Sequence, residues 1–167
     1  MTESRPHVLL VEYVLFTEDI AAAFSKMGYT ITRVKPGALT VERFRELCEY
    51  HEPRFVFSVN YSPEIAYLAG INTLPYVSWT VDPLPAYRYR IYTDTDVNHC
   101  LLFGHDPRAI RIFRKLGFPH SFVLPLAASD LKRYPLETED DTRQYICPVS
   151  FVGSALSSDG KSARENL

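Results

Sequence analysis

Several motifs that would identify a chemistry are missing from this sequence. The residues that follow the first apolar run read VEYVLFTED, without the G-x-G-x-x-G turn that lets a backbone approach a dinucleotide pyrophosphate. There is also no G-x-x-x-x-G-K-[ST] phosphate loop and no G-x-S-x-G nucleophile elbow. These absences argue against dinucleotide binding of the Rossmann type, P-loop phosphate binding and an α/β-hydrolase.

Long apolar runs, excess charge and paired cysteines are also lacking. No run reaches the roughly 18–20 apolar residues that cross a bilayer, and Met1–Pro6 is too polar for a signal peptide. The net charge of −2 gives no positive field that would attract nucleic acid. Cys48, Cys100 and Cys147 are odd in number and show no C-x-x-C spacing. We therefore expect reduced thiols, no metal site and a cytoplasmic location.

The sequence does contain the composition and the alternating pattern of a globular α/β protein. Apolar residues make up 46% and charged residues 23% of the chain. Segments of strand length alternate with segments of helical period. The predicted strands are His7–Tyr13, Tyr29–Lys35, Arg54–Val59, Leu74–Thr80, Asn98–Gly104 and Phe122–Leu124. The predicted helix caps are Thr17, Thr40, Ser62 and Asp106.

This order predicts a Rossmann-like three-layer (αβα) domain with a mostly parallel sheet, built with right-handed crossovers. We expect the strand order 3-2-1-4-5, with the sixth strand at the edge. The domain should span residues 1–135, and the polar, acidic segment 136–148 predicts a linker. Val149–Gly153 reads as a new strand, so residues 149–167 are expected to begin a second, truncated domain.

Ligands of open parallel sheets bind outside the carboxyl ends of the strands, which directs attention to three loops. The first holds Asn60, Tyr61 and Ser62 at a helix N-terminus, a set that can bind hydroxyl-rich or anionic ligands. The alternative is that Ser62 before Pro63 is a simple helix cap. A third strand that ends in Asn60 also argues against a phosphoacceptor receiver domain, which needs a carboxylate there.

The second loop carries Trp79 and Asp82, and the third carries His105. Asp82 could accept hydrogen bonds from sugar hydroxyls or act as a general base. Alternatively, Asp82 starts an Asx-type turn while Trp79 packs in the core. His105 could titrate near neutrality, but it stands beside Asp106, which reads as an N-cap. The basic residues Arg108, Arg111, Arg114 and Lys115 on the following helix predict a solvated face or a docking surface for a second domain.

Three segments together resemble a known family. They are NYSPEIAYLAGINTLPYVSWTVDPL (Asn60–Leu84), LPLAASD (Leu124–Asp130) and VSFVGS (Val149–Ser154). As a set they are similar to the N-terminal half of bacterial glycosyltransferases of the spore-maturation (CgeB-like) type, over roughly residues 7–154.

The resemblance implies an enzyme of the GT-B type, in which two Rossmann-like domains face each other across a cleft. This chain would be the acceptor-side domain, in which Asp82 matches the family's aspartate and Asn60 and Ser62 match its asparagine loop. Together with the chemistry of the loops, this leads us to expect Asp82 as the catalytic residue and Asn60, Tyr61, Ser62, Trp79 and His105 as residues that bind the sugar acceptor. The nucleotide-sugar donor would bind the C-terminal domain, which is the expected partner, so no cofactor is expected in this chain. The fragment alone should be inactive, and its exposed inter-domain face could support a dimer. The alternative from another class is a non-catalytic Rossmann-like module that binds a ligand or a partner protein.

Overall fold

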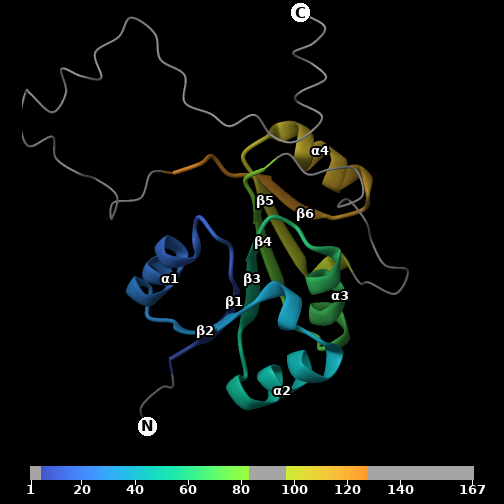
Figure 1. Ribbon diagram of the computed structural model, residues 1–167. Coiled ribbons are helices and arrows are strands. Elements are labelled where there is room, and N and C mark those ends of the chain that lie inside the picture. The colour runs from blue at the N-terminus through green and yellow to red at the C-terminus, as the bar shows by residue number, and fades with distance from the viewer. Residues whose placement is uncertain (1–4, 83–96, 128–167) are drawn as a thin grey trace, which may run out of the picture. The chain divides into compact units, whose positions relative to one another are not determined.

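The computed structural model describes residues 5–82 and 97–127, all of which belong to the first of two units, Met1–Leu131 and Lys132–Leu167. In this part a six-stranded, all-parallel sheet is flanked by helices on both faces, as a Rossmann-like three-layer fold requires (Figure 1). The strands are β1 (His7–Val11), β2 (Thr30–Val34), β3 (Phe55–Val59), β4 (Tyr76–Thr80), β5 (Cys100–Gly104) and β6 (His120–Val123). The helices are α1 (Thr17–Lys26), α2 (Val41–His51), α3 (Pro63–Ile71) and α4 (Pro107–Lys115), with short 3-10 turns η1 (Pro36–Ala38) and η3 (Val97–His99).

Three of the four predicted helix caps are confirmed. The side chains of Thr40, Ser62 and Asp106 accept hydrogen bonds from the first turns of α2, α3 and α4, at 3.1, 3.3 and 2.8 Å. The prediction for Thr17 is wrong, because Thr17 is the first residue of α1 and Phe16 occupies the cap position. The Thr17 hydroxyl bonds backward to Tyr13 instead.

The strand order differs from the predicted 3-2-1-4-5. It is β2-β1-β3-β4-β5-β6, so β3 lies between β1 and β4, and β2 forms one edge. The physical reason lies in the burial that each strand needs. In β3 four of five residues are buried, as expected for an interior parallel strand, whereas β2 exposes Thr30 and Arg33. The switch point is therefore between the loops after β1 and β3, and not between those after β1 and β4.

The two faces of the sheet bury separate cores. One core lies under α1 and includes Val8, Leu10, Ala21 and Phe57. The other lies under α2, α3 and α4 and includes Phe44, Ile65 and Phe113, each at most 3% exposed. Figure 1 shows α1 on one side of the sheet and α2 and α3 on the other. Because β1 feeds α1 on one face and β3 feeds α3 on the other, the chain diverges at their carboxyl ends and leaves room for a site there.

Some of the remaining sequence predictions concern residues outside the described ranges. The linker at 136–148 and the strand Val149–Gly153 lie outside the described residues, as does Cys147. Within the described residues, Cys48 and Cys100 take part in no disulfide bond. Among residues 5–82 and 97–127, no helix is long and apolar enough to cross a membrane.

Candidate functional site at the carboxyl edge of the sheet

Asn60 organises the loops at this edge. It follows β3 in the left-handed region, with φ of 61°, a conformation that asparagine tolerates better than most residues. Its side-chain oxygen accepts hydrogen bonds from the backbone N–H groups of Val81 and Asp82, at 3.0 and 3.1 Å. Its own N–H donates to the carbonyl of Trp79 at 2.9 Å. Asn60 therefore fixes the path of the chain as it leaves β4.

Asp82 receives two donors on the same carboxylate oxygen. The amide of Asn60 donates to Oδ2 at 2.8 Å, and the Tyr13 hydroxyl donates to the same atom. Asp82 is exposed, and among the described residues its Oδ1 has no hydrogen-bond partner. The carboxylate thus has one oxygen held by the protein and one that can accept a hydrogen bond from a ligand.

Tyr13 is the member of this group that the sequence analysis missed. The Thr17 hydroxyl accepts from the Tyr13 N–H and donates to the Tyr13 carbonyl, both at 2.7 Å, and so anchors the residue. The pKa of the Tyr13 phenol is raised, first by its hydrogen bond to Asp82 and then by burial and by the charge of Asp82. The position of Tyr13 directly after the first predicted strand did indicate the carboxyl edge of the sheet. Its hydrogen-bond partner Asp82 follows a different strand, so the sequence did not reveal the contact.

Two of the predicted site residues have structural roles. Tyr61 was expected to line the cleft, yet it is 1% exposed and its ring packs edge-on against Phe113 and Phe118, each at 5.4 Å between centroids. The reason is that Tyr61 points into the core under α3 and α4. Ser62 is the cap of α3, and its hydroxyl also donates to Glu64 at 2.7 Å. Ser62 is therefore explained by the alternative of a simple helix cap.

A buried tyrosine supports the α3 side of this edge. Tyr76 is fully buried, with its hydroxyl 2.6 Å from the Ser58 hydroxyl and accepting from the Ser62 N–H at 3.0 Å. Burial raises the pKa of Tyr76 to about 12, although the hydrogen bonds with Ser58 and Ser62 oppose this. Tyr76 is consequently a neutral structural group that ties β3 and β4 to the start of α3.

Trp79 and His105 flank the Asn60–Asp82 contact. Trp79 is half-buried, and its ring lies 6.0 Å from that of Phe16, on the face covered by α1. Its indole nitrogen is buried and has no hydrogen-bond partner within residues 5–82 and 97–127. His105 donates its backbone N–H to the Thr80 carbonyl at 3.3 Å, and its Nδ1 lies 3.4 Å from the same oxygen. His105 therefore contacts Thr80, which is the last residue of β4 and precedes Asp82 by two positions.

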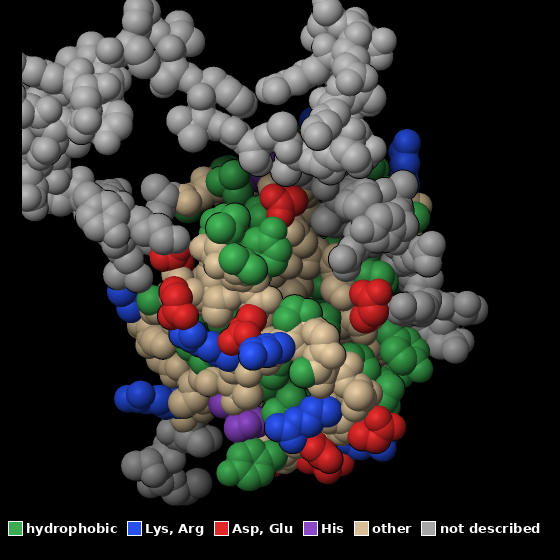
Figure 2. Space-filling view, in the orientation of Figure 1, with side chains coloured by type: hydrophobic (Ala, Val, Ile, Leu, Met, Phe, Trp, Pro, Cys, Tyr) green, Lys and Arg blue, Asp and Glu red, His purple; other side chains and the backbone are tan. Residues whose placement is uncertain are grey.

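Apolar side chains are exposed next to this polar group. Val14 and Leu15 follow Tyr13 and are 98% and 64% exposed. Figure 2 shows hydrophobic side chains gathered near the top of the view, where the carboxyl ends of the strands lie. The edge thus combines a hydrogen-bonding carboxylate with apolar surface, which suits a ligand or partner with both hydroxyl and apolar parts.

The described residues contain no group of three or more His, Cys, Asp or Glu side chains that could hold a metal ion. Comparisons with protein families, with curated proteins and with solved structures find no match to this chain. The described part of the chain is a Rossmann-like domain whose carboxyl edge carries a hydrogen-bonded group of Asp82, Asn60 and Tyr13. We call this group the carboxyl-edge triad.

Proposed function

We propose that this chain is the acceptor-side domain of a metal-independent glycosyltransferase of the GT-B type. The observation that supports this most directly is the state of Asp82 at the carboxyl edge. Tyr13 and Asn60 hold one carboxylate oxygen, and the other has no hydrogen-bond partner among the described residues, so an acceptor hydroxyl could bind to it. A carboxylate fixed in this way can orient an acceptor hydroxyl and accept its proton as the hydroxyl attacks the donor sugar.

The surroundings of Asp82 support a sugar-binding role. The ring of Tyr13 stacks near that of Phe16 at 6.1 Å, and Phe16 in turn contacts Trp79. Aromatic rings beside a hydrogen-bonding carboxylate provide the mixed polar and apolar lining that ligand sites use. The nucleotide-sugar donor would bind a second domain, with Asp82 facing that domain across the cleft.

The test uses the full-length natural protein, assayed for sugar transfer and for hydrolysis of nucleotide-sugar donors. Replacing Asp82 by Asn should lower kcat by about 10²–10⁴-fold, the usual contribution of a general base. Glu12→Gln is the matched control, because Glu12 lies at the same edge without a hydrogen bond to the carboxyl-edge triad. Unchanged activity in Asp82→Asn would remove Asp82 from the mechanism.

A non-catalytic Rossmann-like module is the second candidate, and the exposure of Val14 and Leu15 favours it. Apolar side chains at a loop tip are typical of protein interaction sites. The length of the natural open reading frame beyond Leu167 separates the two candidates. About 150 further residues with alternating strands and helices, the size of one more domain, would support the enzyme.

A further inference from the structure

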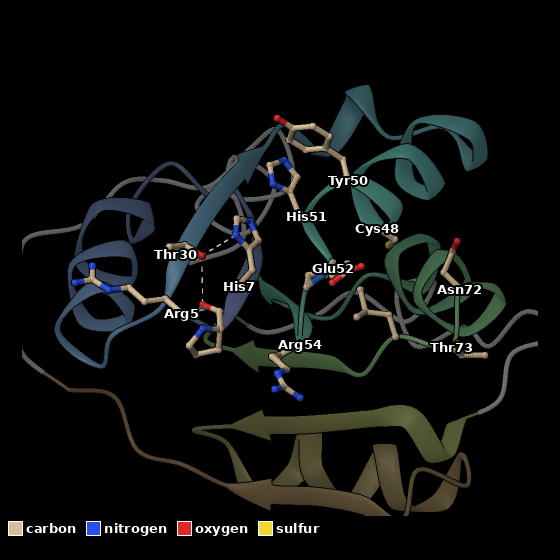
Figure 3. Close-up of a pocket in the computed structure, with 13 residues that line it drawn as sticks. Arg5, His7, Thr30, Cys48, Tyr50, His51, Glu52, Arg54, Asn72 and Thr73 are labelled. Carbon is tan, nitrogen blue, oxygen red and sulfur yellow. Dashed lines mark hydrogen bonds between the residues drawn. The ribbon is translucent and has the colours of Figure 1, made fainter. Parts of the chain in front are cut away.

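The opposite edge of the sheet carries a pair of stacked histidines in an open pocket of about 700 Å³. The rings of His7 on β1 and His51 at the end of α2 lie 4.5 Å apart between centroids and within 11° of parallel. Figure 3 shows the two rings close together, with Thr30 bonded to His7, while Arg5 and Arg54 extend in different directions. Histidine side chains are also visible near the bottom of Figure 2.

The hydrogen bonds around His7 limit where its proton can lie. In one arrangement of the protons, the Thr30 hydroxyl donates to the Pro6 carbonyl at 3.3 Å and accepts from His7 Nδ1, 2.7 Å away. In this arrangement, which we adopt for the proposal below, His7 carries its proton on Nδ1. In the neutral ring Nε2 is then an acceptor, and it receives the hydroxyl proton of Thr32 at 3.0 Å.

The same reasoning extends to the second histidine. Since the Thr32 hydroxyl gives its only proton to His7, it must accept from His51 Nε2, 3.2 Å away. The hydrogen bonds then run in one direction, from His51 through Thr32, His7 and Thr30 to Pro6. This chain joins the end of α2 to β2, β1 and the segment before β1, and its link from Thr32 to His7 requires a neutral His7.

A second proton on each of the two rings would break the chain. Nε2 of His7 and Nε2 of His51 would then both donate to the Thr32 hydroxyl, and the hydroxyl proton of Thr32 would have no acceptor. Protonation of both rings would also place two positive charges on rings that stack 4.5 Å apart between centroids. The other titratable or charged groups lining the pocket are Arg5, Cys48, Tyr50, Glu52 and Arg54. Glu52 is the one carboxylate among these lining residues, whereas Arg5 and Arg54 contribute two positive charges.

Burial and the neighbouring His51 both lower the pKa of His7, in agreement with this geometry. A histidine whose pKa is lower in the folded than in the unfolded protein stabilises the fold above the unfolded value of 6.5. That contribution is lost as the pH falls through the lowered folded value. The stacked arrangement does not suit a shared metal ion, because the nitrogens of parallel rings do not converge on one point.

We propose that the His7–Thr32–His51 chain is a pH-sensitive latch that holds the edge strand β2 and the end of α2 on the sheet while His7 is neutral. Acidification opens this corner and leaves the opposite, carboxyl edge in place. The latch is independent of the proposed glycosyltransferase function, because it shares no residue with the carboxyl-edge triad.

Amide hydrogen exchange of the whole chain tests the latch, between about pH 7.5 and about pH 5, the range in which histidine changes charge. After correction for intrinsic rates, amides of Thr30–Val34 and of the last turn of α2 should lose protection several-fold in acid. His7→Gln should abolish this pH dependence, because glutamine offers a donor and an acceptor without titrating. His120→Gln is the matched control, since His120 is exposed on β6, and it should behave as the parent chain does.

A pH dependence that persists in His7→Gln, or equal protection at both pH values in the parent chain, overturns the latch. A second measurement covers the case in which His7→Gln does not fold. Imidazole ¹⁵N chemical shifts of the parent chain near pH 7.5 should show His7 with its proton on Nδ1. A His7 ring protonated on Nε2 overturns the proposal.

Discussion

Tyr13 and Asp82 are 69 residues apart in the sequence, and the phenol of the first donates directly to the carboxylate of the second. The contact joins the loop after β1 to the loop after β4, although these strands are not neighbours in the sheet. It spans the end of β3, where Asn60 donates to the same oxygen. The two donors leave the orientation of the Asp82 carboxylate little freedom, and four experiments follow from these and related contacts.

The pKa of Tyr13 should report on this contact. Replacing Asp82 by Ala removes both the acceptor and the negative charge, so the raised pKa of Tyr13 should return towards the ordinary tyrosine value. The measurement is a pH titration of ¹³C-labelled tyrosine rings by NMR, with the Tyr13 signal assigned from Tyr13→Phe. Glu12→Gln should leave the titration unchanged. A Tyr13 pKa that is the same with and without Asp82 would show that the contact does not persist in solution.

Thr17 should also affect the pKa of Tyr13, because its hydroxyl holds the Tyr13 backbone. Thr17→Val keeps the shape of the side chain but removes both hydrogen bonds to the Tyr13 backbone. We expect a loss of about 1–2 kcal/mol in the free energy of unfolding, together with a shift of the Tyr13 pKa towards the ordinary value. Thr17→Ser retains the hydroxyl and should preserve both properties. Equal effects of Val and Ser would mean that packing, and not the hydroxyl, is responsible.

Asn60 should be more sensitive to alanine than to glycine. Asn60→Ala removes the acceptor of two backbone N–H groups and places in the left-handed region a residue that tolerates it less well than asparagine does. The expected loss is about 2–4 kcal/mol in urea unfolding. Asn60→Gly loses the same hydrogen bonds but adopts this φ without steric cost, so its loss should be about 1 kcal/mol smaller. Identical losses would indicate that the backbone conformation of residue 60 relaxes in the variants.

Gly70 should not tolerate a β-carbon. Within a helix, Gly→Ala ordinarily stabilises by up to about 1 kcal/mol. Gly70 is the penultimate residue of α3, but a Cβ there would lie 2.9 Å from Cε1 of His99. His99 cannot move away freely, because its Nε2 is bonded to the Ala66 carbonyl at 3.0 Å. We therefore expect a loss of about 1–3 kcal/mol in the free energy of unfolding.

Gly37→Ala is the control for this substitution, since a Cβ there would meet nothing within 4 Å. Combining Gly70→Ala with His99→Ser should recover part of the loss relative to His99→Ser alone. A Gly70→Ala variant as stable as the parent would contradict the close packing of η3 against α3.

The sequence allowed the elements to be predicted, but not the order of the strands. Strands and caps depend on local patterns, which is why Thr40, Ser62 and Asp106 could be identified as caps. The strand order depends on which strand must be covered on both faces. The alternation TITRV in β2 against the apolar FVFSV in β3 did contain that information, because an edge strand can expose polar residues and an interior parallel strand cannot.

The candidate site was predicted in part for a related reason. Asn60 and Asp82 follow strands directly, so their place at the carboxyl edge could be inferred from the alternation alone. Tyr61 could not be distinguished from Asn60 in this way, because whether a loop side chain points outward or into the core depends on the packing of α3 and α4. Tyr13 was missed because its role arises only when three strand ends are set side by side.

Asn60 combines two requirements that restrict what evolution can place at its position. A glycine would adopt the left-handed φ but could not accept hydrogen bonds from the loop after β4. Most other residues would meet neither requirement. An aspartate would tolerate the left-handed conformation and accept from the Val81 and Asp82 N–H groups, but it would set a second negative charge against Asp82. Only an exchange of the two side chains, Asn60→Asp together with Asp82→Asn, would restore the pairing. That exchange would also move the carboxylate away from position 82, where the proposed catalysis needs it, so an active related chain should keep the amide at position 60 and the carboxylate at position 82.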